Sequence, residues 1–256
     1  MLAPLITAIR TLTLLPVPGT DTAQLSRSLS SFPWVGLILG TLLWLAGWGF
    51  EALSWGLWAQ GEAVFLALLL ALLTRALHLD GLADWADSYG AGNNREKALL
   101  IMKDSTNGAF GVVALVLYLL LWVTLATALL EQDGRWWLVL VLVLSRSMMV
   151  ELMTAYPNAR AEGTAGAFMA GAGKVQRWLA ALSGLGLCYG LFGGSALAAF
   201  GLALGATHLF GWAQTKRLGG ITGDLIGASC LINEAILLLF ALLYRPSLAP
   251  WWAGWR

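Results

Sequence analysis

The chain has 256 residues, of which 59% are hydrophobic and 11% are charged, and its formal net charge is +1. Soluble globular domains are roughly 45–50% apolar and about 25% charged, so this composition excludes an ordinary soluble protein. The near-neutral charge gives no argument for nucleic-acid binding. We expect residues 1–256 to form a single integral membrane domain, because no internal repeat, linker or change of composition divides the chain.

The N-terminal segment is predicted to form a short helix that lies in the membrane interface. Its apolar residues share one helical face, with the polar ones opposite: Leu2, Leu5, Ile6, Ile9 and Leu12 against Thr7, Arg10 and Thr11. Pro16 and Pro18 then end the helix. We do not expect a signal peptide, since the segment has no basic start and Arg10 interrupts its apolar stretch.

Seven apolar runs follow, each near the roughly 20 residues that a helix needs to cross a bilayer. They cover residues 34–58, 62–79, 109–130, 136–156, 177–194, 195–214 and 225–244. Only Gly193, Gly194 and Ser195 separate the fifth run from the sixth, so residues 177–214 could also form one long kinked element. The sequence therefore predicts an all-α, polytopic transmembrane helical bundle with about seven spans.

The basic residues predict the orientation of this bundle. Eleven of the fifteen would lie on the side of the N-terminus: Arg10, Arg27, Arg75, Arg95, Lys97, Lys103, Arg160, Lys174, Arg177, Lys216 and Arg217. Arg135, Arg245 and Arg256 would lie on the other side, and Arg146 within a span. Because cytoplasmic loops carry the excess of Lys and Arg, the N-terminus and the loops near 88–103, 157–176 and 215–224 are predicted to be cytoplasmic.

A polar stretch at residues 75–111 interrupts the apolar sequence and is the first candidate site. Asp80, Asp84 and Asp87 are spaced i, i+4 and i+7, so a helix would project them from one face. Carboxylates gathered in this way repel one another unless a cation such as Mg2+ binds them. Asp104 lies in the same stretch. The alternative is a solvated helix face without a ligand.

Two further polar islands are predicted to share that side of the membrane. Residues 156–164 contain Arg160, whose guanidinium could hold a phosphate through paired hydrogen bonds, or could be an ordinary topology-setting arginine. Residues 216–224 contain Lys216, Gly219, Gly220 and Asp224 just before a helix, where backbone N–H groups can face an anion.

Clustered carboxylates, basic side chains and glycine turns are the groups that phosphoryl transfer uses. His78 could serve as base or substrate contact, although a lone histidine at a helix end is more often structural. Cys188 and Cys230 lie in predicted spans without metal-ligand spacing, so we interpret them as packing residues and predict no disulfide.

The chain resembles the adenosylcobinamide-GDP ribazoletransferases, also called cobalamin-5'-phosphate synthases, over nearly its whole length. The motifs that carry the resemblance are LLPVPG at 14–19, FPWVGLILG at 32–40, HLDGLADWAD at 78–87, IMKDSTNGAFG at 101–111, ARAEG at 159–163 and LGGITGDLIGA at 218–228. The resemblance implies a multi-pass enzyme of the cell inner membrane whose active site faces the cytoplasm. It would use Mg2+ to join adenosylcobinamide-GDP to α-ribazole or α-ribazole 5'-phosphate, with release of GMP.

On this interpretation Asp80, Asp84 and Asp87 would bind one or two Mg2+ ions, and Asp104 and Asp224 would complete the site. The substrate phosphates would contact Lys103, Ser105, Arg160, Lys216 and the turn at Gly219 and Gly220. An aspartate or His78 would take the proton of the attacking hydroxyl. The family usually has an arginine at the position of Thr106, so that contact would be lost or supplied by Lys103.

Two other classes stay open from the sequence. A CDP-alcohol phosphotransferase that makes phospholipid also carries aspartates on helices, but the Arg and later Asp of its motif are missing here at the expected spacing. A cation-coupled transporter would need ionisable groups near the midplane. Those available are Glu51, Arg146, Glu151, His208 and Glu234. The sequence also leaves the oligomeric state open, with a homo-oligomer as one option.

Overall fold

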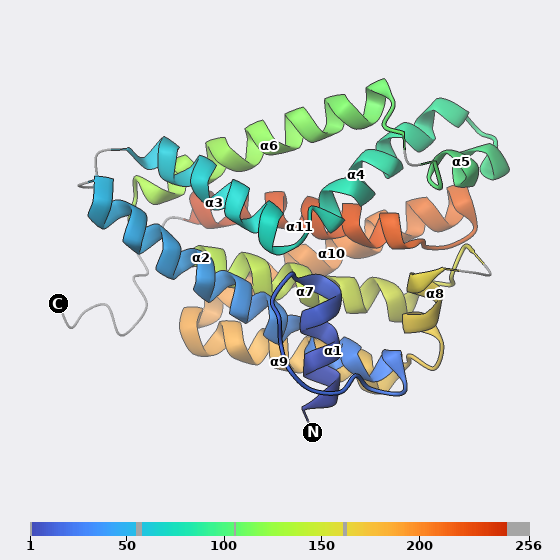
Figure 1. The fold of residues 1–256 in the computed structure, drawn as a ribbon, viewed down its shortest axis with the longest axis horizontal. Helices are drawn as coiled ribbons and strands as arrows, with labels where there is room; N and C mark the ends of the chain where they lie inside the picture. Colours follow the sequence, from blue (N-terminus) through green and yellow to red (C-terminus); the bar gives the residue numbers. More distant parts are fainter. Residues whose placement is uncertain (1, 55–57, 105, 161–162, 245–256) are drawn as a thin grey trace.

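Helices form nearly all the regular structure of the chain in the computed structural model, which describes residues 2–54, 58–104, 106–160 and 163–244 (Figure 1). The α-helices in these ranges are α1 (Ala3–Leu12), α2 (Phe32–Ser54), α3 (Ala59–Leu73), α4 (Leu77–Asp87), α5 (Arg95–Ile101), α6 (Ala109–Leu130), α7 (Trp137–Ala155), α8 (Thr164–Met169), α9 (Lys174–Phe192), α10 (Gly194–Leu218) and α11 (Gly223–Tyr244). Two 3-10 helices, η1 (Leu25–Ser31) and η2 (Ser88–Ala91), precede α2 and follow α4. The all-α prediction is confirmed for the described residues, which contain no strand.

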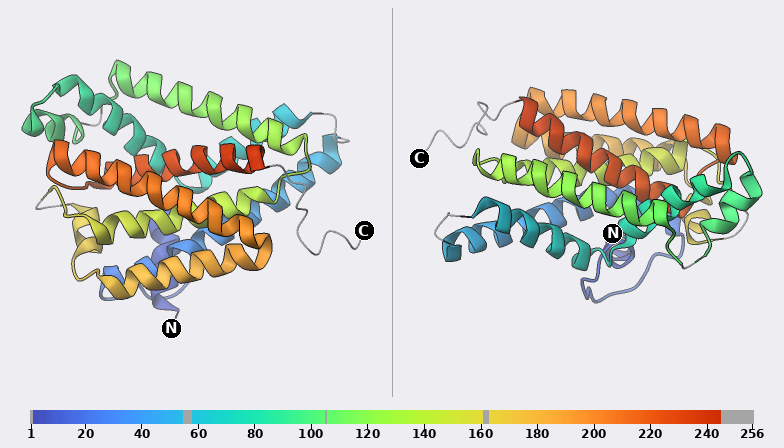
Figure 2. Two further views of the ribbon diagram at one scale, coloured as in Figure 1. Left: turned by 180° about the vertical axis from the view of Figure 1, so that it is seen from behind. Right: turned by 90° about the horizontal axis from the view of Figure 1, so that it is seen from above.

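Helix α7 lies at the centre of the bundle and is buried along almost its whole length. It packs against α2, α9, α10 and α11, and Figure 2 shows α9 and α10 beside it from behind. Its contact with α2 depends on two small residues one turn apart. A Cβ added at Gly36 would lie 2.3 Å from the Leu142 carbonyl oxygen, and one at Gly40 would lie 2.7 Å from Val139 Cα. Glycines at this spacing let two helix backbones approach closely.

The structure supports a multi-pass membrane protein, although it does not reproduce the predicted number of spans. Five stretches are long and apolar enough to cross a membrane: Leu25–Leu53, α6, α7, α10 and α11. A sixth is added if α3 and α4 count as one bent span. The fifth predicted span, residues 177–194, corresponds to α9, which is not among these stretches because Lys174, Gln176 and Arg177 fall in its first turn. Residues 177–214 form two helices, separated at Gly193, rather than one kinked element.

The predicted continuous span over residues 62–79 is wrong, because α3 ends at Leu73 and α4 starts at Leu77 with an 89° bend between them. Arg75 and Ala76 both have positive φ angles there. The N-terminal segment contacts this break. The Leu14 amide donates to the Leu73 carbonyl at 2.7 Å, and the Arg75 guanidinium donates to the carbonyls of Arg10 and Thr11 at the end of α1.

The predicted N-terminal helix is present as α1, which buries Ala8, Ile9 and Leu12 and packs against η1 and α2. Arg10 does not extend into solvent as a free cation. Its guanidinium donates to the carbonyls of Val17 and Gly19 and pairs with Asp21 at 2.8 Å. The proline-containing loop after α1 is therefore tied back to the helix, which fixes the approach to α2.

Different elements meet at the two ends of the bundle (Figure 1). The α4–α5 region, α8 and the start of α11 meet at one end, on the right of the picture, and we call this the polar end. The end of α2, the start of α3 and the turn between α6 and α7 meet at the other end, on the left. The sequence-predicted site residues within the described ranges lie towards the polar end.

Candidate active site

Close packing of α4 against α11 brings the carboxylates of α4 beside the start of α11. The contact passes over Gly81, where an added Cβ would lie 2.7 Å from the carbonyl oxygen of Asp224. Asp80 is exposed and Asp84, one turn later on the same face, is half-buried. The Asp84 carboxylate lies within electrostatic range of Asp224, Asp80 and Asp87, and of the Arg160 guanidinium. The sequence spacing and the helix packing thus place several acids around one arginine.

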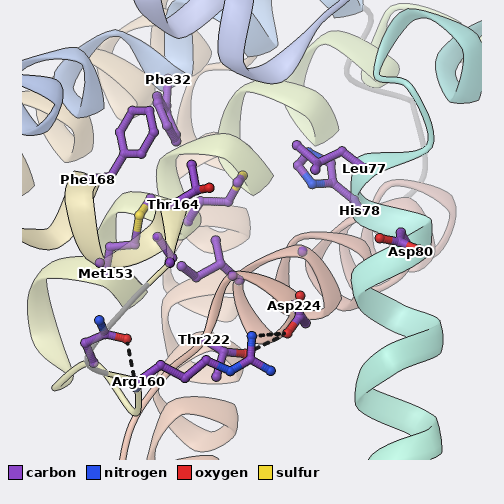
Figure 3. A pocket seen from close by; sticks show the side chains of 18 residues that line it. Phe32, Leu77, His78, Asp80, Met153, Arg160, Thr164, Phe168, Thr222 and Asp224 are labelled. Carbon is purple, nitrogen blue, oxygen red and sulfur yellow. Dashed lines mark hydrogen bonds and ion pairs between the residues drawn. The ribbon is translucent and has the colours of Figure 1, made fainter. Parts of the chain in front are cut away.

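A short backbone pairing positions Arg160 over the N-terminus of α11. The amide of Ala159 donates to the Ile221 carbonyl at 2.9 Å, and the Ile221 amide donates to the Pro157 carbonyl at 2.8 Å. Gly220 makes this approach possible, because its φ is +157° and a Cβ there would lie 2.4 Å from the Pro157 oxygen. Arg160 Nη1 then reaches Asp224 Oδ2 at 3.1 Å, as Figure 3 shows.

The Arg160 guanidinium is only partly satisfied by the protein. Besides the ion pair with Asp224, Nη2 donates weakly to the Leu99 carbonyl at 3.4 Å. Its Nε is buried and has no hydrogen-bond partner among the residues that the structure describes. A buried donor without a partner is costly, and a phosphate oxygen is the kind of acceptor that a guanidinium binds best.

A cavity of about 310 Å³ opens beside this ion pair. The polar side chains that line it come from α4, α8, the 156–160 loop and the start of α11, and include His78, Asp80, Asn158, Arg160, Thr164, Thr222 and Asp224. Its apolar wall comes from α2, α4, α7, α8 and α11, and includes Phe32, Leu77, Met149, Met153, Phe168 and Ile226. Figure 3 shows Phe32 and Phe168 on one side of the space and the Arg160–Asp224 pair on the other.

Asp87 makes contacts that the sequence analysis did not anticipate. Its carboxylate is buried and accepts the amide of Gly108 at 2.7 Å and that of Gly111 at 2.8 Å. These amides belong to the N-terminus of α6, where a carboxylate satisfies free N–H groups and complements the helix dipole. Asp87 therefore joins α4 to α6, while Asp80 lines the cavity.

Several predicted contact residues lie outside the cavity wall. Lys103 and Asp104 are exposed, and Ser105 lies outside the described residues. Asp104 accepts the Thr106 hydroxyl at 2.8 Å and the Thr106 amide at 3.0 Å, and these hydrogen bonds hold the pKa of its carboxyl below the usual value. Lys216 is also exposed, with Nζ 4.0 Å from the centre of the Trp212 ring. The direct substrate and metal roles of these residues stay predictions.

The glycine turn at 219–220 shapes the site rather than lining it. Gly219 ends α10 in the left-handed conformation, with φ +78°. Arg95 crosses over from α5 and its Nε donates to the Leu218 carbonyl at 2.7 Å. No local pattern predicts this role of Arg95, because the carbonyl that it contacts is distant along the chain. Asn158 and Thr222 line the cavity and were not predicted either.

His78 is buried and lines both the main cavity and a smaller one of about 30 Å³. Its Nε2 has no hydrogen-bond partner. The smaller cavity also borders Arg146 and Glu234, which form an ion pair deep in the bundle, and Tyr118 donates to Glu234 at 3.0 Å. Glu234 is completely buried there.

The donor chemistry of the site fits a hard divalent cation. Asp80, Asp84 and Asp224 offer carboxylate oxygens, the ligands that Mg2+ prefers. Among the described residues, however, no three His, Cys, Asp or Glu side chains converge as metal ligands would. Asp224 instead forms an ion pair with Arg160.

The chain is similar in sequence to one family of known enzymes. A sequence profile described as cobalamin-5-phosphate synthase matches residues 4–242. An adenosylcobinamide-GDP ribazoletransferase of Chlorobium chlorochromatii is 42% identical over 95% of this chain and 97% of its own length. Enzymes of the same name from Chlorobaculum tepidum, at 40% identity over 99% of each chain, and Pseudomonas entomophila, at 41% identity over 92% of this chain and 97% of its own length, are also similar. No solved structure matches significantly.

Proposed function

The chain belongs to the cobalamin-5-phosphate synthase family, and from this premise we propose that it joins adenosylcobinamide-GDP to α-ribazole or α-ribazole 5'-phosphate with release of GMP. The observation that carries the assignment is the partly satisfied Arg160 guanidinium, held over the N-terminus of α11 beside Asp224 and Asp80. A cation with a free donor, a helix N-terminus and neighbouring carboxylates form a site for a diphosphate with its counter-ion.

The reaction is a substitution at phosphorus. The ribazole 3'-oxygen forms a bond to the cobinamide-side phosphorus, and the bond from that phosphorus to the GMP oxygen breaks, so that GMP leaves with the electron pair. Mg2+, bound by Asp80, Asp84 and Asp224, would supply charge neutralisation for the diphosphate and the leaving group.

The residues of the chain have separate tasks in this scheme. Arg160 binds a phosphate oxygen through Nε and is released from Asp224 when the diphosphate enters. The first turn of α11 presents its N–H groups to the same anion. The hydroxyl proton passes to a group on the cavity wall, and Asp80 and His78 are the candidates, since both line the cavity.

We further propose seven membrane passes, with the N-terminus and the polar end in the cytoplasm and the protein in the inner membrane. The support comes from the positive-inside rule and from α9, which lies alongside α7. The five apolar stretches, α9 and the bent α3–α4 pair together give seven passes. Single cysteines test this arrangement in a background without Cys188 and Cys230. Asn93→Cys should be protected from an impermeant reagent in intact cells and Gln132→Cys should react; the reverse pattern would overturn the orientation.

The activity itself is tested with purified protein, adenosylcobinamide-GDP, α-ribazole 5'-phosphate and Mg2+. With the protein present, GMP should form only when both substrates and Mg2+ are added. It should form in a one-to-one ratio with the corrinoid product. Release of GMP without ribazole would indicate a hydrolase instead. Transfer of the phosphoalcohol group of a CDP-alcohol to a second alcohol, with release of CMP, would favour the phospholipid enzyme that the sequence left open.

A further inference from the structure

The main cavity has a charged side and an apolar side. This difference indicates which kind of molecule can bind there. One wall presents the charged and hydrogen-bonding groups around Arg160, Asp224 and Asp80, and the opposite wall is apolar. Phe32 and Phe168 form an edge-to-face pair there, with ring centroids 6.3 Å apart. Met149 and Met153 extend the same wall from the central helix α7. Figure 3 shows Thr164 and Met153 between the phenylalanine pair and the ion pair in this view.

Aromatic rings and thioethers together suit a flat, uncharged ring system. Methionine sulfur makes favourable contacts with ring edges, and phenylalanine offers a face or an edge to a second ring. The side chains of this wall have no hydrogen-bonding groups. A ring whose edge carries several donors and acceptors would leave them unpaired there, which weakens its binding.

The two substrates of the proposed reaction differ in the number of hydrogen-bonding groups on the edges of their rings. The guanine of the GDP group has a polar edge with donors and acceptors, whereas the benzimidazole of α-ribazole carries methyl groups and one free ring nitrogen. Size points the same way. A volume of about 310 Å³ is at the lower end of the roughly 300–1,000 Å³ of small-molecule sites, enough for a nucleoside-sized body and too small for a corrinoid macrocycle.

We propose that this cavity is the α-ribazole site, with the benzimidazole against Phe32, Phe168 and Met153 and the ribose directed to Asp80 and Arg160. Adenosylcobinamide-GDP then approaches from outside the cavity, and only its diphosphate reaches Arg160. This assignment rests on the proposed function. Because the apolar wall is already formed by packed helices, the neutral nucleoside should bind without the other substrate.

The first experiment measures binding to the wild-type protein without turnover. Neutral α-ribazole, which lacks the phosphate that Arg160 would attract, is titrated by calorimetry in the absence of adenosylcobinamide-GDP, and guanosine is titrated in parallel. α-Ribazole should bind at least about tenfold more tightly than guanosine, the scale of discrimination that one or two apolar contacts supply. Equal or tighter binding of guanosine, or no binding of α-ribazole, would overturn the assignment.

The second experiment uses two variants of the cavity wall and one matched control. Ala165→Leu adds bulk to a lining residue of α8, and Met153→Gln keeps the length of the side chain while adding an amide to the apolar wall. Each should raise KM for α-ribazole about tenfold or more, with KM for adenosylcobinamide-GDP changed less than about twofold. Ala167→Leu makes the same substitution at an exposed residue of the same helix that does not line the cavity, and should change neither constant.

An increase in KM for adenosylcobinamide-GDP alone would place the guanine in the cavity and contradict the proposal. If one variant fails to fold, the other variant and the calorimetry still decide the question. Failure of this inference is also distinct from failure of the proposed function. A wild-type protein that binds α-ribazole but forms no GMP would refute the activity, whereas a protein that forms GMP normally but has the wrong KM pattern would refute only the cavity assignment.

Discussion

An arginine stands among carboxylates at each end of the bundle, and the two clusters differ in how completely the arginine is paired. At the turn before α7, Arg135 donates from Nε and Nη2 to Glu62 and from Nη1 to Glu51. At the polar end, Arg160 has one ion pair and one long contact to a carbonyl, and its Nε has no hydrogen-bond partner in the described part of the chain. Both clusters border cavities of about 300 Å³, so volume does not distinguish them.

The difference teaches how to separate a structural charge cluster from a functional one. Arg135 joins α2, α3 and the turn before α7 through side chains alone, and each of its three nitrogens donates to a carboxylate. Arg160 is held in place by backbone pairing at 157–159 and 219–221, which leaves its Nε available for a ligand. Arg177 resembles Arg135, because its Nε and Nη2 both donate to Glu151. Arg146 pairs with Glu234 deep in the bundle, where it borders only the smaller cavity, although its Nε has no hydrogen-bond partner among the described residues. In both of these pairs the opposite charges offset one another, so the pairs give no support to the transporter alternative.

The largest expected effect is on stability at the left end. Arg135→Gln leaves Glu62, whose side chain is 6% exposed, without its counter-ion. Removing one partner of such a buried pair costs about 3–5 kcal/mol of the free energy of unfolding. The melting temperature in detergent should fall sharply, while kcat/KM per folded molecule stays near the wild-type value. Lost turnover in a protein of normal stability would show that this cluster is also part of a site.

The reverse pattern is expected at the polar end. Asp84→Asn preserves shape and removes a negative charge from a group that lies near Asp80, Asp87 and Asp224. We expect kcat/KM to fall roughly 10²–10³-fold, the scale for losing an electrostatic element of a transition state. Without Mg2+ the melting temperature should stay the same or rise, because repulsion among the acids is relieved.

Mg2+ provides an independent readout of the same variant. Binding to the folded wild-type protein should raise the melting temperature in proportion to RT ln(1 + [Mg2+]/Kd). In Asp84→Asn this increase should shrink or disappear. A variant that keeps both the Mg2+ response and near-normal GMP release would exclude Asp84 from the metal site.

Much of the fold and part of the site could be predicted from local sequence. Apolar runs indicated the helices, and the i, i+4 spacing of Asp80 and Asp84 placed them on one face because helical periodicity is local. The association of Arg160 with Asp224 was only suggested by their shared side of the membrane. The actual contact depends on the pairing of residues 157–159 with residue 221, about 60 positions away, which no local pattern encodes.

Other features depended on long-range packing and were therefore missed. The break between α3 and α4 occurs where α1 and its loop contact Leu73 and Arg75. Asp87 has the right spacing for a ligand of the α4 cluster, but α6 brings the amides of Gly108 and Gly111 to its carboxylate. Sequence spacing gives the face of a helix, and the neighbouring elements determine what that face meets.

Arg160→Lys sharpens the comparison with a smaller change. Lysine keeps the positive charge but cannot place two parallel donors on a phosphate. The expected loss in kcat/KM corresponds to about 1–3 kcal/mol, the value of a charged hydrogen bond. Arg27→Lys serves as the control, because Arg27 is exposed and, within the described ranges, its guanidinium donates to the nearby Gln24 side chain. Equal kinetics in the two variants would return Arg160 to a purely topological role.

The smallest expected effect separates Asp87 from the neighbouring carboxylates of α4. In Asp87→Asn one carboxylate oxygen becomes an NH2 group, which cannot accept the Gly108 or Gly111 amide. Loss of an N-terminal helix cap costs about 0.5–2 kcal/mol, so the melting temperature should fall modestly. The Mg2+-induced increase should remain, unlike in Asp84→Asn. If Asp87→Asn instead keeps its stability and loses the Mg2+ response, the carboxylate leaves α6 to bind the metal, and all three acids act together as their spacing first indicated.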